Sequence, residues 1–140
     1  MKRIRMILLC TISLVQAAKA ADEVPPVAVA GLNAYRTNGL KAAYEICSKG
    51  SLEDDKASRD AAVSGLPQVE STYGRVSGYD VSRAVPIGSA VKRMYLVLFS
   101  EKGPVYAYIV CYKTGEKWCV TDLVLHTKAN ALFPASLLGG

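Results

Sequence analysis

Three runs rich in valine, leucine, isoleucine and aromatic residues dominate the second half of the chain. They cover residues 94–100, 105–113 and 117–126, and glycine-containing connections separate them. Runs of this length and composition predict three consecutive antiparallel strands. A more polar alternation at residues 79–85 stops at Pro86, which is typical of an edge or half-exposed strand. The pattern predicts a four-stranded meander.

The first half of the chain has helical spacing instead. Pro25 and Pro26 can open a helix over residues 27–37, because the missing N–H of proline is harmless in a first turn. Gly39 then marks a break. An apolar stripe with i, i+3, i+4 and i+7 spacing follows and predicts a second helix. Its members are Leu40, Ala43, Tyr44 and Cys47.

A third helix is expected to begin at Ser51, whose hydroxyl can cap its free N–H groups. The first turn would then hold three acidic residues, which the helix dipole favours there. These are Glu53, Asp54 and Asp55. We expect no metal at this trio, because no second cluster of ligands accompanies it. The helix should reach Leu66, and Pro67 should kink it or begin a new short helix.

The N-terminus has the features of an export signal. Three basic residues lie among the first five, an apolar run covers residues 6–15, and a small-residue cleavage motif occupies residues 18–20. The run is too short to span a membrane, so we predict a signal peptide over residues 1–20 and no lasting membrane anchor. One α+β domain, residues 21–140, would remain in the periplasm or be secreted.

Removal of this segment changes the charge of the protein. The full chain has 17 Lys and Arg against 12 Asp and Glu, with a pI of about 9.1. Four of the basic residues lie in the first 20 positions, so the remainder holds 13 basic and 12 acidic residues. A nucleic-acid partner would require a basic patch, and we expect none.

Three cysteines follow the predicted cleavage site: Cys47, Cys111 and Cys119. An oxidising compartment favours pairing, and an odd number leaves one thiol over. A three-residue hairpin loop at residues 114–116 would place Cys111 opposite Cys119 and permit a cross-strand disulfide. A two-residue turn at Thr114 and Gly115 would instead place Cys119 opposite Val110 and disfavour the disulfide. We expect the disulfide, with Cys47 as a buried free thiol.

The three-residue loop also predicts two different faces of the sheet. One face is small and aliphatic and suits helix packing; it would carry Ala107, Ile109, Cys111, Cys119, Thr121, Leu123 and Leu125. The other would carry Tyr106, Tyr108, Val110, Tyr112, Trp118, Val120, Asp122, Val124 and His126. A face this apolar must be covered, because large apolar patches usually mark interaction surfaces. The cover is the C-terminal tail, a second copy in a homodimer, or a ligand.

The predicted ligand-binding residues are Tyr106, Tyr108, Tyr112, Trp118, Asp122 and His126. Tyrosine and tryptophan suit such a site because each combines apolar area with one polar group. Asp122 would either hydrogen-bond to Tyr108 or orient a polar group of a ligand, because an unpaired buried carboxylate is costly. The expected partner is a small apolar ligand or a protein.

Catalysis is not favoured by the residue pattern. Cys119 and His126 are seven positions apart and point to opposite faces of a regular strand. Asp122 and His126 share a face, but four strand residues separate them by about 13 Å. One histidine and three separated cysteines form no recognisable metal site. We therefore predict a noncatalytic binding module with no metal or other cofactor; a small enzyme using Asp122 or His126 is the alternative.

The segment KGPVYAYIVCYKTGEKWCVTDLVLHTK, following several helices, resembles the small exported bacterial members of the NTF2-like and cystatin-like α+β superfamily. The resemblance covers roughly residues 27–138. It implies N-terminal helices packed on one face of a curved four-stranded antiparallel meander. It also implies a cone between helices and sheet that holds a ligand or an active site.

Overall fold

The computed structural model describes residues 24–139, so the predicted signal peptide lies outside the described residues. Three helices precede the strands: α2 (Pro26–Asn38), α3 (Leu40–Ser48) and α4 (Lys56–Tyr73). The strands are β1 (Val76–Ile87), β2 (Val91–Ser100), β3 (Gly103–Thr114) and β4 (Lys117–His126). The helix α5 (Ala129–Leu132) and a 3-10 turn (Ala135–Leu137) follow. In the described chain no helix is long and apolar enough to cross a membrane.

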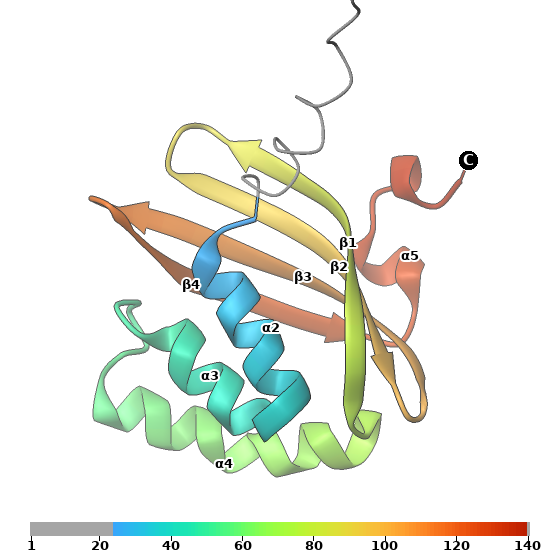
Figure 1. The fold of residues 1–140 in the computed structure, drawn as a ribbon, viewed down its shortest axis with the longest axis horizontal. Coiled ribbons are helices and arrows are strands. Elements are labelled where there is room, and N and C mark those ends of the chain that lie inside the picture. The colour runs from blue at the N-terminus through green and yellow to red at the C-terminus, as the bar shows by residue number, and fades with distance from the viewer. Residues whose placement is uncertain (1–23, 140) are drawn as a thin grey trace, which may run out of the picture.

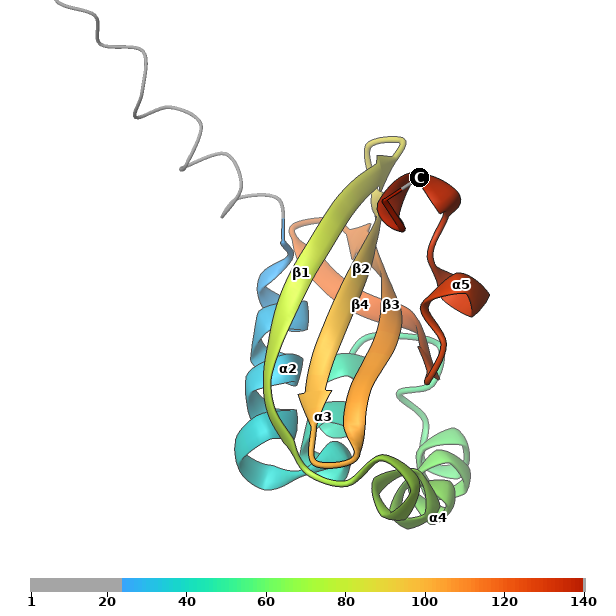
Figure 2. The same ribbon diagram turned by 90° about the vertical axis from the view of Figure 1, so that its right-hand side faces the viewer.

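The strands form one curved antiparallel sheet in the order β1-β2-β3-β4 (Figure 1). The predicted α+β fold class is therefore confirmed. Figure 2 shows α2 and α3 on one side of the sheet and α5 on the other. We call these two sides the inner face and the outer face, respectively. Both β1 and β4 are edge strands of the sheet.

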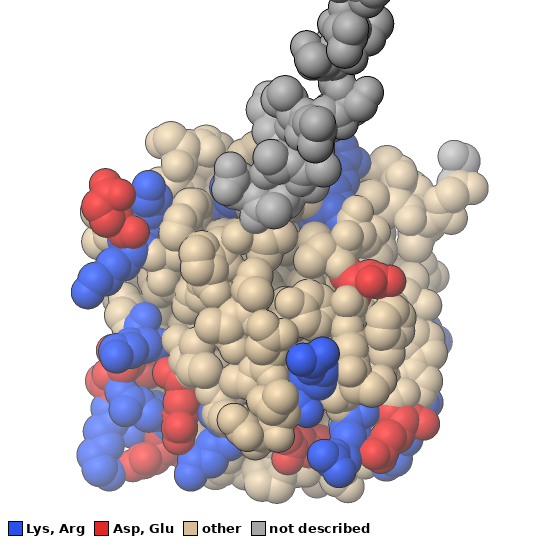
Figure 3. Space-filling model, in the orientation of Figure 1, with Lys and Arg blue, Asp and Glu red and all other residues tan. Residues whose placement is uncertain are grey.

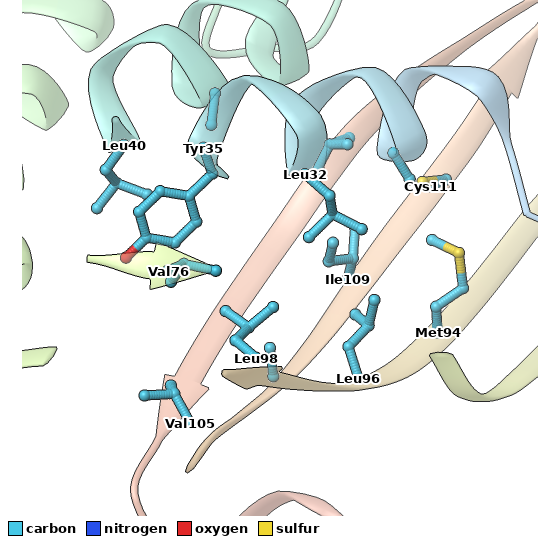
Figure 4. Packing of buried hydrophobic residues seen from close by; sticks show 14 residues of the cluster. Leu32, Tyr35, Leu40, Val76, Met94, Leu96, Leu98, Val105, Ile109 and Cys111 are labelled. Carbon is cyan, nitrogen blue, oxygen red and sulfur yellow. The ribbon is translucent and has the colours of Figure 1, made fainter. Parts of the chain in front are cut away.

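The core lies between α2 and the inner face (Figure 4). Leu32 and Tyr35 of α2 are each 7% exposed. Met94, Leu96 and Cys111 of the sheet are fully buried. These three sheet residues are inner-face positions, while the residues next to them in each strand point to the outer face. The apolar alternation of β2 and β3 thus fixes which side of the sheet α2 covers.

Two details of α4 differ from the prediction. The helix begins at Lys56 and its N-cap is Asp55, which accepts a hydrogen bond from the backbone N–H of Ser58 at 2.9 Å. Ser51 instead donates to the carbonyl of Ser48 in the preceding turn. Asp55 is the stronger competitor because its carboxylate can accept from the first turn with a full charge. Pro67 lies inside the continuous helix.

The predicted hairpin register is wrong. Thr114 pairs with Lys117, so the turn has two residues, and Gly115 supplies its positive φ of 60°. Cys111 therefore lies opposite Val120, and the described cysteines are free thiols. The Cys111–Cys119 disulfide is not formed, because a cross-strand bridge requires the two residues to face each other.

A β-bulge adds a second correction. The register shifts between Val110 and Cys111, which pair with Asp122 and Val120 respectively. The extra residue on β4 reverses the alternation of side chains on either side of it. Trp118 and Val120 therefore lie on the inner face, together with their partners on β3, and not on the face predicted for them.

Candidate functional site

A cavity of about 470 Å³ lies between α3, α4 and the edge strand β4. We call it the helix–strand cavity. It is lined by Leu40, Ala43, Tyr44, Cys47, Ser48, Glu53, Ala62, Leu66, Val69, Tyr73 and residues 120–125. Most of these side chains are apolar. Pockets of roughly 300–1,000 Å³ with apolar walls and a few polar groups are typical of small-molecule sites.

The cavity exists because α4 does not pack closely on the sheet. No residue of α4 is buried, although the helix has 18 residues. Its middle is rich in small residues, namely Ala57, Ala61, Ala62, Ser64 and Gly65. Of these, Ala62 lines the cavity, and its side chain is too short to fill the space beside β4, while the other four are exposed. Leu66, Val69 and Tyr73 are the larger side chains that α4 contributes to the wall.

The opposite wall is the free edge of the sheet. The lining includes six consecutive residues of β4, 120–125, so the cavity follows the strand along its edge. Leu123 and Leu125 pair with Ile109 and Ala107 and therefore point to the inner face. Leu123 is 44% exposed. A leucine exposed to this extent at an edge next to a cavity is an apolar surface available to a ligand.

Polar groups gather at one end of the cavity. Figure 1 shows α3 and α4 running in opposite directions, so the end of α3 and the α3–α4 connection lie together. There the Tyr44 hydroxyl donates a hydrogen bond to Oε2 of Glu53 at 3.3 Å. Burial and the nearby Glu53 carboxylate both raise the pKa of Tyr44. The tyrosine therefore remains a neutral donor across the ordinary pH range.

Cys47 lies in the cavity wall but lacks the environment of a nucleophile. Burial raises the pKa of its thiol from 9.0 to about 11. Reactive cysteines have lowered pKa values, because the thiolate is the nucleophile. The helix α2 approaches closely here: a Cβ added to Gly31 would overlap Sγ of Cys47. Cys47 is a packing residue in this structure.

Most of the residues predicted to bind a ligand do share the outer face. By strand pairing, Tyr106 lies opposite His126, Tyr108 opposite Val124, and Asp122 opposite Val110. Tyr112 also points outward and is 43% exposed. The expected Asp122–Tyr108 neighbour pair is wrong, because Asp122 is displaced along the strand by the new register. Asp122 is exposed and meets the helix–strand cavity at the edge of the sheet.

Trp118 does not belong to this group. It lies on the inner face beside Val27 and Pro26 at the start of α2. Nζ of Lys92 is 5.6 Å from the centre of its ring, and Nζ of Lys113 is 6.0 Å away. Cation–π contacts of this length are favourable. Trp118 thus closes one end of the core and takes no part in the outer face.

The C-terminal tail covers part of the outer face. Phe133 is 7% exposed and meets Tyr95 and Tyr106 edge-on, with both ring centroids 5.5 Å away. Arg93 covers the Tyr108 ring, with its guanidinium carbon 5.0 Å from the ring centre. The tail is therefore the cover for the middle of this face, one of the three coverings expected from the sequence.

Asp122 and His126 are the residues of the alternative prediction, a small enzyme. The two residues lie opposite Val110 and Tyr106, four positions apart along β4. Nδ1 of His126 accepts a hydrogen bond from the backbone N–H of Lys128 at 2.9 Å, so this nitrogen is occupied locally. Across residues 24–139 there is no group of three His, Cys, Asp or Glu side chains that could hold a metal.

The resemblance implies a ligand-holding cone between helices and sheet, but of the residues predicted to bind a ligand Asp122 alone lines the helix–strand cavity. Leu40, Ala43, Tyr44 and Cys47 were interpreted as a core stripe, and that interpretation holds for Leu40 and Ala43, which are buried. The signal that could have indicated the cavity is Ala62, a small residue on the side of α4 that carries Leu66, Val69 and Tyr73.

No family model and no curated protein matches this sequence. The fold is similar to that of a DUF4783 family protein from Bacteroides ovatus ATCC 8483, with a TM-score of 0.52 and 12% identity. This similarity covers 74% of the present chain and 94% of that chain. A DUF4783 family protein from Bacteroides fragilis YCH46 has a TM-score of 0.40 and 18% identity over 48% of this chain and 61% of its own. The first similarity shows a shared fold.

Proposed function

We propose that the protein is an exported, noncatalytic binding module of the NTF2-like and cystatin-like kind that holds a small apolar ligand in the helix–strand cavity. The observation that carries the proposal is the 470 Å³ cavity, with its apolar walls and a polar group at one end. Apolar surface transferred from water stabilises a complex by about 25 cal/mol per Å². The resemblance to that superfamily supports a ligand in a cone between helices and sheet.

Export is part of the same proposal. The basic start, the apolar run at residues 6–15 and the small-residue motif at residues 18–20 support it. N-terminal sequencing of the protein recovered from the extracytoplasmic fraction tests it. A chain that begins at Ala21 is expected. A full-length chain recovered only with the cytoplasm would contradict export.

Native mass spectrometry of the protein purified from its own cells tests the binding function. The expected result is a monomer that carries extra mass, which solvent extraction removes. Ala62→Phe places a ring in the cavity and should abolish the extra mass. Ala61→Phe is the matched control, because Ala61 is the exposed neighbour on α4 and does not line the cavity. Retention of the ligand by Ala62→Phe would contradict the proposed site.

A homodimer through the outer face is a second candidate, and one observation favours it. Ile87 and Tyr112 flank Val91 across one end of the sheet, and they are 49% and 43% exposed. The tail covers the middle of the face through Phe133 and leaves this end open. A self-complementary apolar patch suits a two-fold interface. We expect the mass in solution to double as the protein concentration rises, and we expect Tyr112→Lys to restore the monomer mass. A mass that does not change with concentration would exclude the dimer.

A further inference from the structure

The two ends of the helix–strand cavity differ in chemistry. At one end lie Leu40, Val69 and Leu125, which are apolar, and Tyr73, which adds an aromatic ring and one hydroxyl. At the other end lie Tyr44, Ser48 and Glu53, which bring two hydroxyls and a carboxylate. The antiparallel course of α3 and α4 keeps these two groups apart (Figure 1). A ligand that fits both ends is amphiphilic, with an apolar body and one polar head.

The charge at the polar end is negative. Among the described residues that line the cavity there is no lysine, arginine or histidine, and there are two acidic residues, Glu53 at this end and Asp122 on β4. The segment that follows, residues 54–60, adds Asp54, Asp55 and Asp60 against Lys56 and Arg59. Figure 3 shows acidic and basic side chains gathered together over the α3–α4 connection.

Arg59 is the basic residue whose charge acts on the Tyr44 hydroxyl, where it opposes the effect of Glu53 on the pKa. Its guanidinium bonds to both the carboxylate and the backbone carbonyl of Asp54. Lys56 pairs with Asp60 at 2.7 Å. Arg59 and Lys56 are thus matched with other acids, while Glu53 accepts from the neutral hydroxyl of Tyr44.

A tyrosine ring beside a carboxylate recognises one kind of head group. The negative face of the ring attracts an ammonium cation, and the carboxylate adds a direct charge interaction. A carboxylate or phosphate head would meet Glu53 with like charge and would find no cationic partner in the lining. A neutral head would gain only hydrogen bonds.

We propose that the helix–strand cavity selects cationic amphiphiles: molecules with an ammonium head at Tyr44 and Glu53 and an apolar body between α4 and β4. This inference rests on the proposed function and names the class of ligand for that same cavity. Because Glu53 is exposed, the charge contributes selectivity and the apolar walls contribute most of the affinity.

Isothermal titration with three probes of equal chain length tests the inference: decyltrimethylammonium and decanoate, each below its micelle concentration, and decanol below its solubility limit. The ammonium probe should bind tightest and decanoate weakest. The affinity of the ammonium probe should exceed that of decanoate by about threefold to tenfold. An exposed charge pair changes affinity by a small factor, and Glu53 attracts the ammonium probe but repels decanoate. The ratio should shrink at high salt.

Glu53→Gln isolates the charge. This substitution keeps the shape and an acceptor for Tyr44. It should reduce the difference between the affinities of the ammonium and carboxylate probes, and Asp122 is then the remaining acid of the lining. Glu45→Gln is the control, because Glu45 is an exposed acid of α3 outside the cavity lining, and it should leave the ratio unchanged.

The outcomes separate the two proposals. If decanol binds and Ala62→Phe abolishes that binding, but decanoate binds as tightly as the ammonium probe, the charge selectivity is wrong and the cavity function stands. An unchanged ratio in Glu53→Gln has the same meaning. If none of the three probes binds, the proposed function and this inference both fail.

Discussion

The carboxylate of Glu70 on α4 accepts a hydrogen bond from the backbone N–H of Leu40 at 2.6 Å. Leu40 is the first residue of α3, and the N-cap position before it is Gly39, which has no side chain to offer. The free N–H groups of a first turn need an acceptor. The next helix along the chain supplies one, so α3 is capped by α4.

Glu70→Ala should therefore lower the free energy of unfolding by about 1 kcal/mol, the usual cost of a lost cap. Urea denaturation followed by circular dichroism measures this change. Glu45→Ala, at an exposed position of α3, should change stability much less. Equal stabilities of the Glu70 variant and the wild type would show that this bond contributes nothing net.

The order of elements follows from the sequence, because apolar periodicity determines which segments can bury a face, while the first three strands are longer than predicted. The run predicted for residues 117–126 is the observed β4. The register does not follow, because it depends on one extra residue in β4 and on a turn of two residues. These small changes placed Trp118 on the inner face and separated Cys111 from Cys119.

The site is harder to predict than the fold for a physical reason. A sequence shows which residues are apolar, but it does not show how far a helix stands from the sheet. Leu66, Val69 and Tyr73 have the spacing of core residues, and yet they line a cavity. Ala62, on the same side of α4, is too short to close the space that remains.

Gly31 and Cys47 form a close contact between α2 and α3. A Cβ at position 31 would overlap Sγ of Cys47, so Gly31→Ala should destabilise the protein by about 1–3 kcal/mol through overpacking. In the background of Cys47→Ala the same change should cost little, because the obstructing sulfur is absent. A double-mutant cycle of unfolding free energies measures the coupling. Additive effects would mean that the contact relaxes without cost.

Phe133 fixes the tail on the outer face, and Phe99 on the same face offers a matched comparison. Phe133 is 7% exposed and Phe99 is 43% exposed. Phe133→Ala should lower the free energy of unfolding by about 3 kcal/mol, at the low end of the range for a core aromatic because only the tail is released. Phe99→Ala should cost clearly less. Similar losses in the two variants would contradict a specific docking of the tail.

The two cysteines of the helix-facing core predict a loss of stability at alkaline pH. Burial raises the pKa of Cys47 to about 11 and that of Cys111 to about 12, against 9.0 for a free thiol. Between about pH 9 and 11 the unfolded chain has lost these protons while the folded protein still holds them. Stability must therefore fall as the pH rises, by up to about 1.4 kcal/mol per pH unit for each thiol.

Urea denaturation at intervals from pH 8 to pH 10.5 measures this slope. Cys47 is partly exposed, so solvent should reduce its contribution to the slope below the upper value of about 1.4 kcal/mol per pH unit. Cys47→Ala should remove this contribution. Cys119→Ala is the control, since it changes a cysteine outside the main core cluster. A slope that Cys47→Ala leaves unchanged would show that the thiol ionises equally well in both states and that its burial is not maintained in solution.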